Sequence, residues 1–181
     1  MGYDMSIEIS ALNEIFVEFY YWITVPLMFL IHVGFCLYEV SISRAKNHIH
    51  TLMKNAMLIP VVTVTFFLFG FWIWFAGQGP FGDFAGGSTG LPWDATMGSN
   101  AKDHIMGVFW AAFLLFSWTA ASIVSGAVIE RIRTGAFLIL AVLVGSVTWM
   151  IDAAWGWSPA GWMVTDWGYH DAYASGVIHG I

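Results

Sequence analysis

The sequence predicts an all-α integral membrane protein that has four transmembrane helices and the start of a fifth. Charged residues make up 10% of the 181 residues and hydrophobic residues 59%, and the mean hydropathy is +0.72. A soluble domain carries about 25% charged residues, so this chain could not solvate its surface in water. The composition excludes a soluble enzyme and a disordered chain, and six Lys and Arg against twelve acids argue against a nucleic-acid binder.

Four apolar stretches are long enough to cross the roughly 30 Å hydrocarbon core of a bilayer, which takes about 20 helical residues. We expect helices over residues 15–40, 52–75, 105–128 and 136–151, and a fifth that begins near Asp171 and reaches Ile181. These stretches are too long for barrel strands and lack period-2 alternation. Residues 1–181 are therefore expected to form a single transmembrane domain.

The basic residues orient the chain. The first connection between helices holds Arg44, Lys46 and Lys54, the third holds Arg131 and Arg133, and the long second connection holds only Lys102. Cytoplasmic connections carry the excess of Lys and Arg. We therefore expect the N-terminus to lie outside a plasma or inner membrane, with no removable signal peptide, because that terminus has no basic n-region.

Ionisable residues inside a membrane helix are costly, and they usually face protein or a pathway. In the first expected helix Glu18, His32 and Glu39 are spaced by 14 and 7 residues, which places them on one stripe that faces other helices. A structural role in helix packing is the expectation for Glu18 and Glu39. His32 is interpreted as a satisfied core histidine or as a residue of a pathway.

The expected fifth helix contains Asp171 and His179, eight residues or about 12 Å apart along its axis. Asp171 would lie at the outer end and His179 near the middle of the membrane. A neutral imidazole at that depth can donate and accept hydrogen bonds without a fixed charge. His179 would suit a path for protons or for a polar small molecule, and a structural role stays equally open.

Aromatic and acidic residues gather in the third helix and in the two outer connections. Phe109, Phe113 and Phe116 are spaced by 4 and 3 residues, so they share a helix face, either for packing or as a stacked gate. The Trp residues of the outer connections fit an aromatic belt or a vestibule that attracts a cation by cation–π contact. The acids of this side would favour cations unless they are simply solvated. They are Asp83, Asp94, Asp103, Asp152 and Asp166.

Three groups of segments resemble those of the ammonium transporter/methylammonium permease/Rhesus family. The first group reads GFCLYE at residues 34–39, SRAKN at 43–47 and LMKN at 52–55, the second reads SGAVIERIR at 125–133, and the third reads DAYASGVIH at 171–179. They occur in the family's order and cover about residues 16–181. The resemblance implies ammonium or ammonia as the transported molecule and a homotrimer in which each protomer has its own pore.

The resemblance also assigns roles to single residues. The Trp that recruits ammonium best matches Trp155, the inner Phe of the outer gate matches Phe116, the first pore histidine matches His179, and the acid that supports the recruitment site without lining the pore matches Asp171. Ala112 and Phe113 stand where the family has a Phe-Gln pair, so Phe113 would replace the missing gate ring from a neighbouring position. The segment between Trp155 and Asp171 is longer than usual, which leaves Trp157 as the alternative to Trp155.

In this family two inverted repeats enclose the pore, and the resemblance covers the first repeat alone. A chain end at Ile181 would lie deep in the bilayer, where a charge is costly. We therefore expect a second half or a partner chain to complete the pore and to supply the second pore histidine.

The leading hypothesis is ammonium or ammonia transport, and the alternative is a non-conducting ammonium-sensing or accessory membrane subunit with the same fold. A redox subunit that holds haem between His32, His104 and His179 is disfavoured, because these histidines are not paired across facing helices. The single cysteine, Cys36, excludes a CxxC metal site. We expect no enzymatic activity, no metal or other cofactor, and no nucleic-acid partner.

Overall fold

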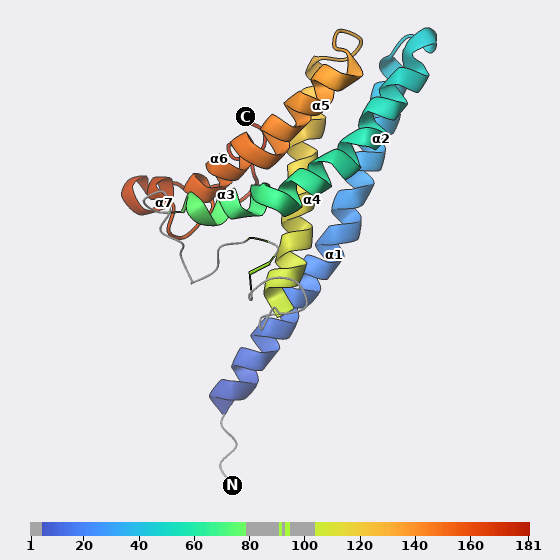
Figure 1. Ribbon diagram of the computed structural model, residues 1–181. Helices are drawn as coiled ribbons and strands as arrows, with labels where there is room; N and C mark the ends of the chain where they lie inside the picture. Colours follow the sequence, from blue (N-terminus) through green and yellow to red (C-terminus); the bar gives the residue numbers. More distant parts are fainter. Residues whose placement is uncertain (1–4, 79–90, 92, 95–103) are drawn as a thin grey trace.

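The computed structural model describes residues 5–78, 91, 93–94 and 104–181, and every regular element in these ranges is a helix (Figure 1). The elements are α1 (Met5–Ile42), η1 (Ala45–Asn47), α2 (His48–Thr65), η2 (Phe66–Gly70), α3 (Phe71–Ala76), α4 (His104–Ala127), α5 (Thr134–Val142), η5 (Leu143–Thr148), α6 (Trp149–Gly156) and α7 (Trp162–Trp167). Element η1 is a 3₁₀ turn, and η2 and η5 are π-helical. The all-α fold class is confirmed.

Four helical runs are long and apolar enough to cross a membrane, namely Ile9–Ile42, Ala45–Ala76, Ile105–Ala127 and Thr134–Gly156. They confirm the four expected spans. The fourth run extends past the expected end at residue 151, because α5, η5 and α6 follow one another without a break. Pro26 in α1 and Pro60 in α2 do not end their helices. Helices that cross membranes tolerate proline where neighbouring groups satisfy the freed carbonyl.

The central helix is α4, which packs on α1, α2, α5, η5 and α6. In its most apolar stretch 61% of the residues are buried, against 17% in the first span. Figure 1 shows α1 as a long helix along one side of the molecule, with α6 and α7 on the other side of α4. Most side chains on α4 are therefore enclosed by protein, whereas most of α1 presents apolar side chains outward.

Small residues bring the second, third and fourth spans into close contact where η2 and η5 meet. A Cβ added at Gly145 would lie 2.8 Å from the backbone oxygen of Ser117, so only glycine fits there without movement. The Ser117 hydroxyl donates to the Gly145 carbonyl at 2.5 Å, and the hydroxyls of Thr65 and Ser146 lie 2.7 Å apart. π-Helical segments such as η2 and η5 often occur at functional sites. Here the contact between η2 and η5 helps to hold three spans together.

The segment after α7 differs from the expected helix, since residues 172–179 form turns. Ala174 has a φ of 60°, which is incompatible with a continuing right-handed helix. The backbone N–H groups of Ser175, Gly176 and Val177 donate to the Asp171 carboxylate. Because a side chain accepts these N–H groups, the segment folds as a capped turn rather than as the first turns of a fifth helix.

Candidate functional site

A buried ion pair joins the first two spans. The Nζ atom of Lys54 lies 3.2 Å from Oε2 of Glu39, and each side chain is 2% exposed. The same Nζ atom donates to the Ser125 carbonyl at 3.1 Å and lies 4.8 Å from the centre of the Phe137 ring. Sequence reasoning counted Lys54 among the cytoplasmic basic residues, but the structure buries its charge between α1, α2, α4 and α5.

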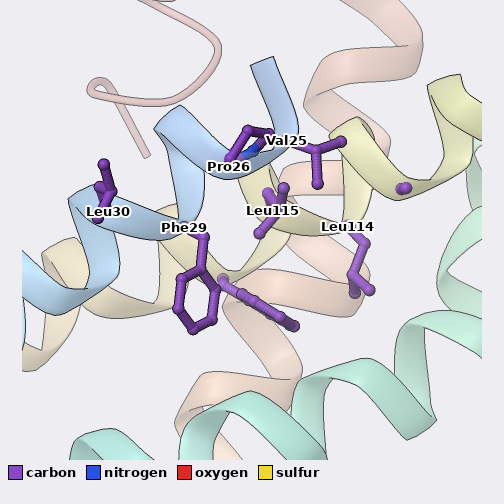
Figure 2. Close-up of a pocket in the computed structure, with 8 residues that line it drawn as sticks. Val25, Pro26, Phe29, Leu30, Leu114 and Leu115 are labelled. Carbon is purple, nitrogen blue, oxygen red and sulfur yellow. The ribbon is translucent and has the colours of Figure 1, made fainter. Parts of the chain in front are cut away.

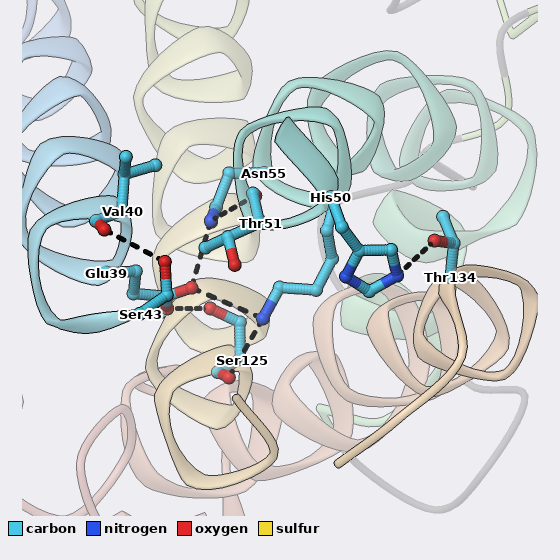
Figure 3. A network of polar contacts seen from close by, with 9 residues as sticks. Glu39, Val40, Ser43, His50, Thr51, Asn55, Ser125 and Thr134 are labelled. Carbon is cyan, nitrogen blue, oxygen red and sulfur yellow. Dashed lines mark hydrogen bonds and ion pairs between the residues drawn. The ribbon is translucent and has the colours of Figure 1, made fainter. Parts of the chain in front are cut away.

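The remaining contacts of Glu39 complete what we call the Glu39 network, formed by Glu39, Lys54, Asn55 and Ser125 (Figure 3). The Asn55 amide donates to Oε2 of Glu39 at 2.9 Å, and the Ser125 hydroxyl donates to Oε1. Both carboxylate oxygens are thus paired in a site closed to water. A carboxylate with all its acceptors occupied is suited to holding helices together and not to binding a ligand.

The expected stripe on α1 is unevenly buried. His32 is 6% exposed and Glu39 is 1% exposed, whereas Glu18 is half-buried. Nδ1 of His32 lies 3.2 Å from the Ser122 hydroxyl, and Nε2 lies 3.2 Å from the Leu115 carbonyl and 3.3 Å from the Thr119 hydroxyl. Both ring nitrogens of His32 therefore have partners on α4.

An apolar groove runs between α1 and α4 and has a volume of about 520 Å³. Figure 2 shows Val25, Pro26, Phe29 and Leu30 of α1 lining it, with Leu114 and Leu115 of α4. Its walls are apolar side chains, so they offer nothing to a small polar solute. The groove is not a candidate for the chemistry of an ion.

The aromatic residues of α4 do not form one stack. Phe109 stacks on Phe113 with centroids 4.7 Å apart and planes at 28°. The Phe113 ring lies 4.8 Å from both Trp74 and Trp149 and is 3% exposed, so it is part of the core. Phe116 is only half-buried and lies near Trp149 and Trp157. Phe109 and Phe116 therefore lie at the edge of the core, whereas Phe113 lies within it.

The two candidate tryptophans face different surroundings. The ring of Trp157 packs 5.5 Å from Phe116, and its Nε1 donates to the Asp171 carbonyl at 3.1 Å. Trp155 is 38% exposed, packs edge-on against Trp162 at 5.7 Å and lines a cavity of about 570 Å³. We call this cavity the Trp155 pocket, and its lining is Thr148, Ile151, Asp152, Trp155, Met163, Tyr169, Gly176, Gly180 and Ile181. Of the two candidate tryptophans, Trp155 is the one among the described residues that line this cavity.

The end of α7 positions Tyr169 at this pocket. Gly168 adopts a left-handed conformation with a φ of 64°, and its N–H donates to the Val164 carbonyl at 3.1 Å. The next N–H, that of Tyr169, donates to the Met163 carbonyl at 2.9 Å. These nested bonds around a left-handed glycine satisfy the last carbonyls of α7 and end the helix. The reversal turns the chain back, so that Tyr169 lines the pocket below α6.

A turn joins Asp171 to His179, and the two side chains have different surroundings. The Asp171 carboxylate accepts the N–H groups of Ser175, Gly176 and Val177 at 2.9, 3.0 and 3.0 Å. The His179 side chain is exposed, and its imidazole has no hydrogen-bond partner within the described part of the chain. Asp171 therefore stabilises the turn that leads to His179.

Sequence reasoning missed Asn55 as a partner of Glu39, and it counted Asp152 only among the acids of the outer side. Asn55 holds Glu39, and Asp152 lines the Trp155 pocket. Asp152 carried a usable signal, because an acid inside an apolar stretch is costly unless it has a role. Asp83, Asp103 and the side chain of His104 lie outside the described residues. Within the described ranges no three His, Cys, Asp or Glu residues are grouped closely enough to hold a metal ion.

Comparison with known proteins gives a consistent result. The model of the Ammonium Transporter Family matches residues 19–181. The chain is 33% identical to ammonium transporter Amt2 of Haloferax mediterranei over 86% of the chain and 33% of that protein. It is 31% identical to Amt2 of Archaeoglobus fulgidus, over 86% of the chain and 33% of that protein, and 31% identical to the ammonium transporter of Bacillus subtilis, over 84% and 37%. The chain thus spans about a third of the length of these relatives. The match over most of its residues shows that the chain belongs to the ammonium transporter family.

Proposed function

We propose that the chain forms the first part of a pathway that carries ammonium or ammonia across a membrane. The observation that supports this most directly is the Trp155 pocket, where an indole that is 38% exposed lies beside the Asp152 carboxylate. An aromatic face attracts a monovalent cation, and a nearby carboxylate adds to that attraction. Proteins similar to this chain are named ammonium transporters, which agrees with a cation of this class.

In the proposed route the ion first binds at Trp155 and then passes Phe116. Phe116 is half-buried beside Trp149 and Trp157, so its ring can close the inner side of the aromatic cluster. A bare cation is costly in a dry apolar channel. The ion must therefore lose its proton or be closely compensated, and His179 is the group proposed to accept that proton or to hydrogen-bond ammonia. Phe113 is proposed to support the gate from the core and not to line the route.

The setting of this route is also proposed. Residues 1–181 would form one transmembrane domain with the N-terminus outside, in a plasma or inner membrane. A second half or a partner chain would supply the second pore histidine, and three protomers would assemble with one pore each. Glu39, Glu18 and His32 would hold the first span against its neighbours, on the opposite side of α4 from the Trp155 pocket.

Uptake of labelled methylammonium into proteoliposomes that contain the full-length protein tests this function. We expect saturable uptake, a loss of about tenfold in uptake efficiency for Trp155→Ala from the missing cation–π contact, and a larger loss for His179→Ala. Trp167→Ala is a matched control, because Trp167 is an exposed indole that does not line the pocket. Cation binding without any flux, with no effect of His179→Ala, would instead identify the non-conducting sensor or accessory subunit.

A further inference from the structure

Two carboxylates lie near the Trp155 pocket, and they differ in what they bind. Asp171 begins the turn after α7, and Asp152 lies on α6 one turn before Trp155. The resemblance to the family directs attention to Asp171 alone. The two side chains differ in hydrogen bonding, however, and the one unpaired among the described residues is that of Asp152.

Donors from nearby residues of the chain already engage both oxygens of the Asp171 carboxylate. Three backbone N–H groups donate to it at 2.9–3.0 Å, and the Tyr169 hydroxyl lies 3.5 Å from Oδ2. One donor reaches Oδ1 and three reach Oδ2, so both oxygens of the carboxylate already have protein partners. Asp171 is therefore a capping residue, because its carboxylate binds backbone N–H groups.

The Asp152 carboxylate is in the opposite situation. It lines the Trp155 pocket and is half-buried, and it forms no hydrogen bond or ion pair within the described part of the chain. Among the described residues that line the pocket there is no Lys, Arg or His. A cation that enters the pocket would be attracted by this charge without competition from a described protein partner.

The other walls of the pocket fit the same ligand. Trp155 offers the face of an indole, and Tyr169 offers a hydroxyl oxygen. Gly176 keeps this wall in place, because a Cβ there would collide with the Tyr169 hydroxyl. The volume of about 570 Å³ leaves room for a small cation together with part of its hydration shell.

We propose that Asp152, and not Asp171, supplies the counter-charge that holds an ammonium or small alkylammonium cation against Trp155. This inference rests on the proposed function and deepens it, since it names the residue that selects a cation over the neutral amine. Asp171 then acts at a distance, by fixing the turn that carries Tyr169 and Gly176 to the pocket.

The test uses the full-length protein with two measurements, methylammonium uptake kinetics in proteoliposomes and tryptophan fluorescence titrated with methylammonium on purified protein. Asp152→Asn should raise both KM and the dissociation constant for methylammonium about tenfold, in line with the loss of one charged contact, with kcat little changed. Asp152→Glu should recover most of the affinity. Asp171→Asn should lower thermal stability, and the fraction that folds should bind methylammonium with nearly the original affinity.

The matched control is Asp166→Asn, which removes one negative charge from the exposed surface of α7. This control distinguishes the loss of a local contact from a general loss of negative potential. The KM of the Asp166→Asn variant should therefore stay close to that of the unmodified protein. The proposal is overturned if Asp152→Asn binds methylammonium normally, or if Asp166→Asn weakens binding as much. Absence of uptake in the unmodified protein would contradict the proposed function, whereas the fluorescence titration would still decide the role of Asp152.

Discussion

The Glu39 network and the Trp155 pocket both place acids within apolar surroundings, but only one of them leaves an acid without a partner. Glu39 meets a lysine, an amide and a hydroxyl from neighbouring helices. Asp152 lines an open cavity in which its described neighbours are aromatic or apolar groups and two hydroxyls. Charges of the first kind hold helices at fixed positions, and charges of the second kind are available to a ligand. The hydrogen bonds of an intramembrane acid thus indicate its role better than its depth does.

The difference between the two regions is tested most directly by removing one charge from each region and measuring thermal stability. Lys54→Met should lower thermal stability strongly, because an unpaired Glu39 would be left in a dry site, at a cost of about 3–5 kcal/mol. Asp152→Asn should leave the melting temperature nearly unchanged. Thermal melting of the purified protein in detergent, followed by tryptophan fluorescence, measures both.

Two further variants control this experiment. Lys46→Met removes an exposed lysine from the same end of the molecule and should have little effect. The double variant Glu39→Leu with Lys54→Met removes both charges, so it should recover much of the lost stability. A Lys54→Met protein that melts like the unmodified one would show that Glu39 is not held by its partner.

The sequence was sufficient to predict the spans but not to predict which side chains pair between them. Hydropathy predicted four membrane-crossing helices, and helical spacing predicted that His32 and Glu39 lie on one face. The partner of Glu39 could not be predicted, because Lys54 lies on another helix and reaches Glu39 only through the crossing of α1, α2 and α4. The expected helix after Asp171 failed for a related reason. Its apolar residues gave no sign that the Asp171 side chain would take up the backbone donors.

Close packing between the two regions can be tested independently of charge. Gly145→Ala would place a methyl group 2.8 Å from the Ser117 carbonyl oxygen, which must move, and we expect a loss of about 1–3 kcal/mol in stability. Gly107→Ala is the matched control in α4, because no atom lies within 4 Å of the added Cβ. That control should be neutral or slightly stabilising, since alanine favours a helix over glycine. Equal melting temperatures for the two variants would mean that the contact of η5 with α4 yields easily.

The smallest expected effect concerns a charge pair that lies in water. Glu130 has a φ of 60°, accepts the Arg44 N–H at 2.5 Å and the Asn47 amide at 3.0 Å, and lies 3.4 Å from the Arg44 side chain. The Arg44 N–H, with the Asn47 amide, holds the pKa of the Glu130 carboxyl below its usual value. A lowered pKa stabilises the fold above the ordinary pKa of a carboxyl, and this contribution disappears as the pH falls through the lowered value. Glu130→Gln should therefore melt slightly lower than the unmodified protein near neutral pH and should match it in strong acid. A difference that persists in acid would show that Glu130 acts through its shape in the left-handed turn and not through its charge.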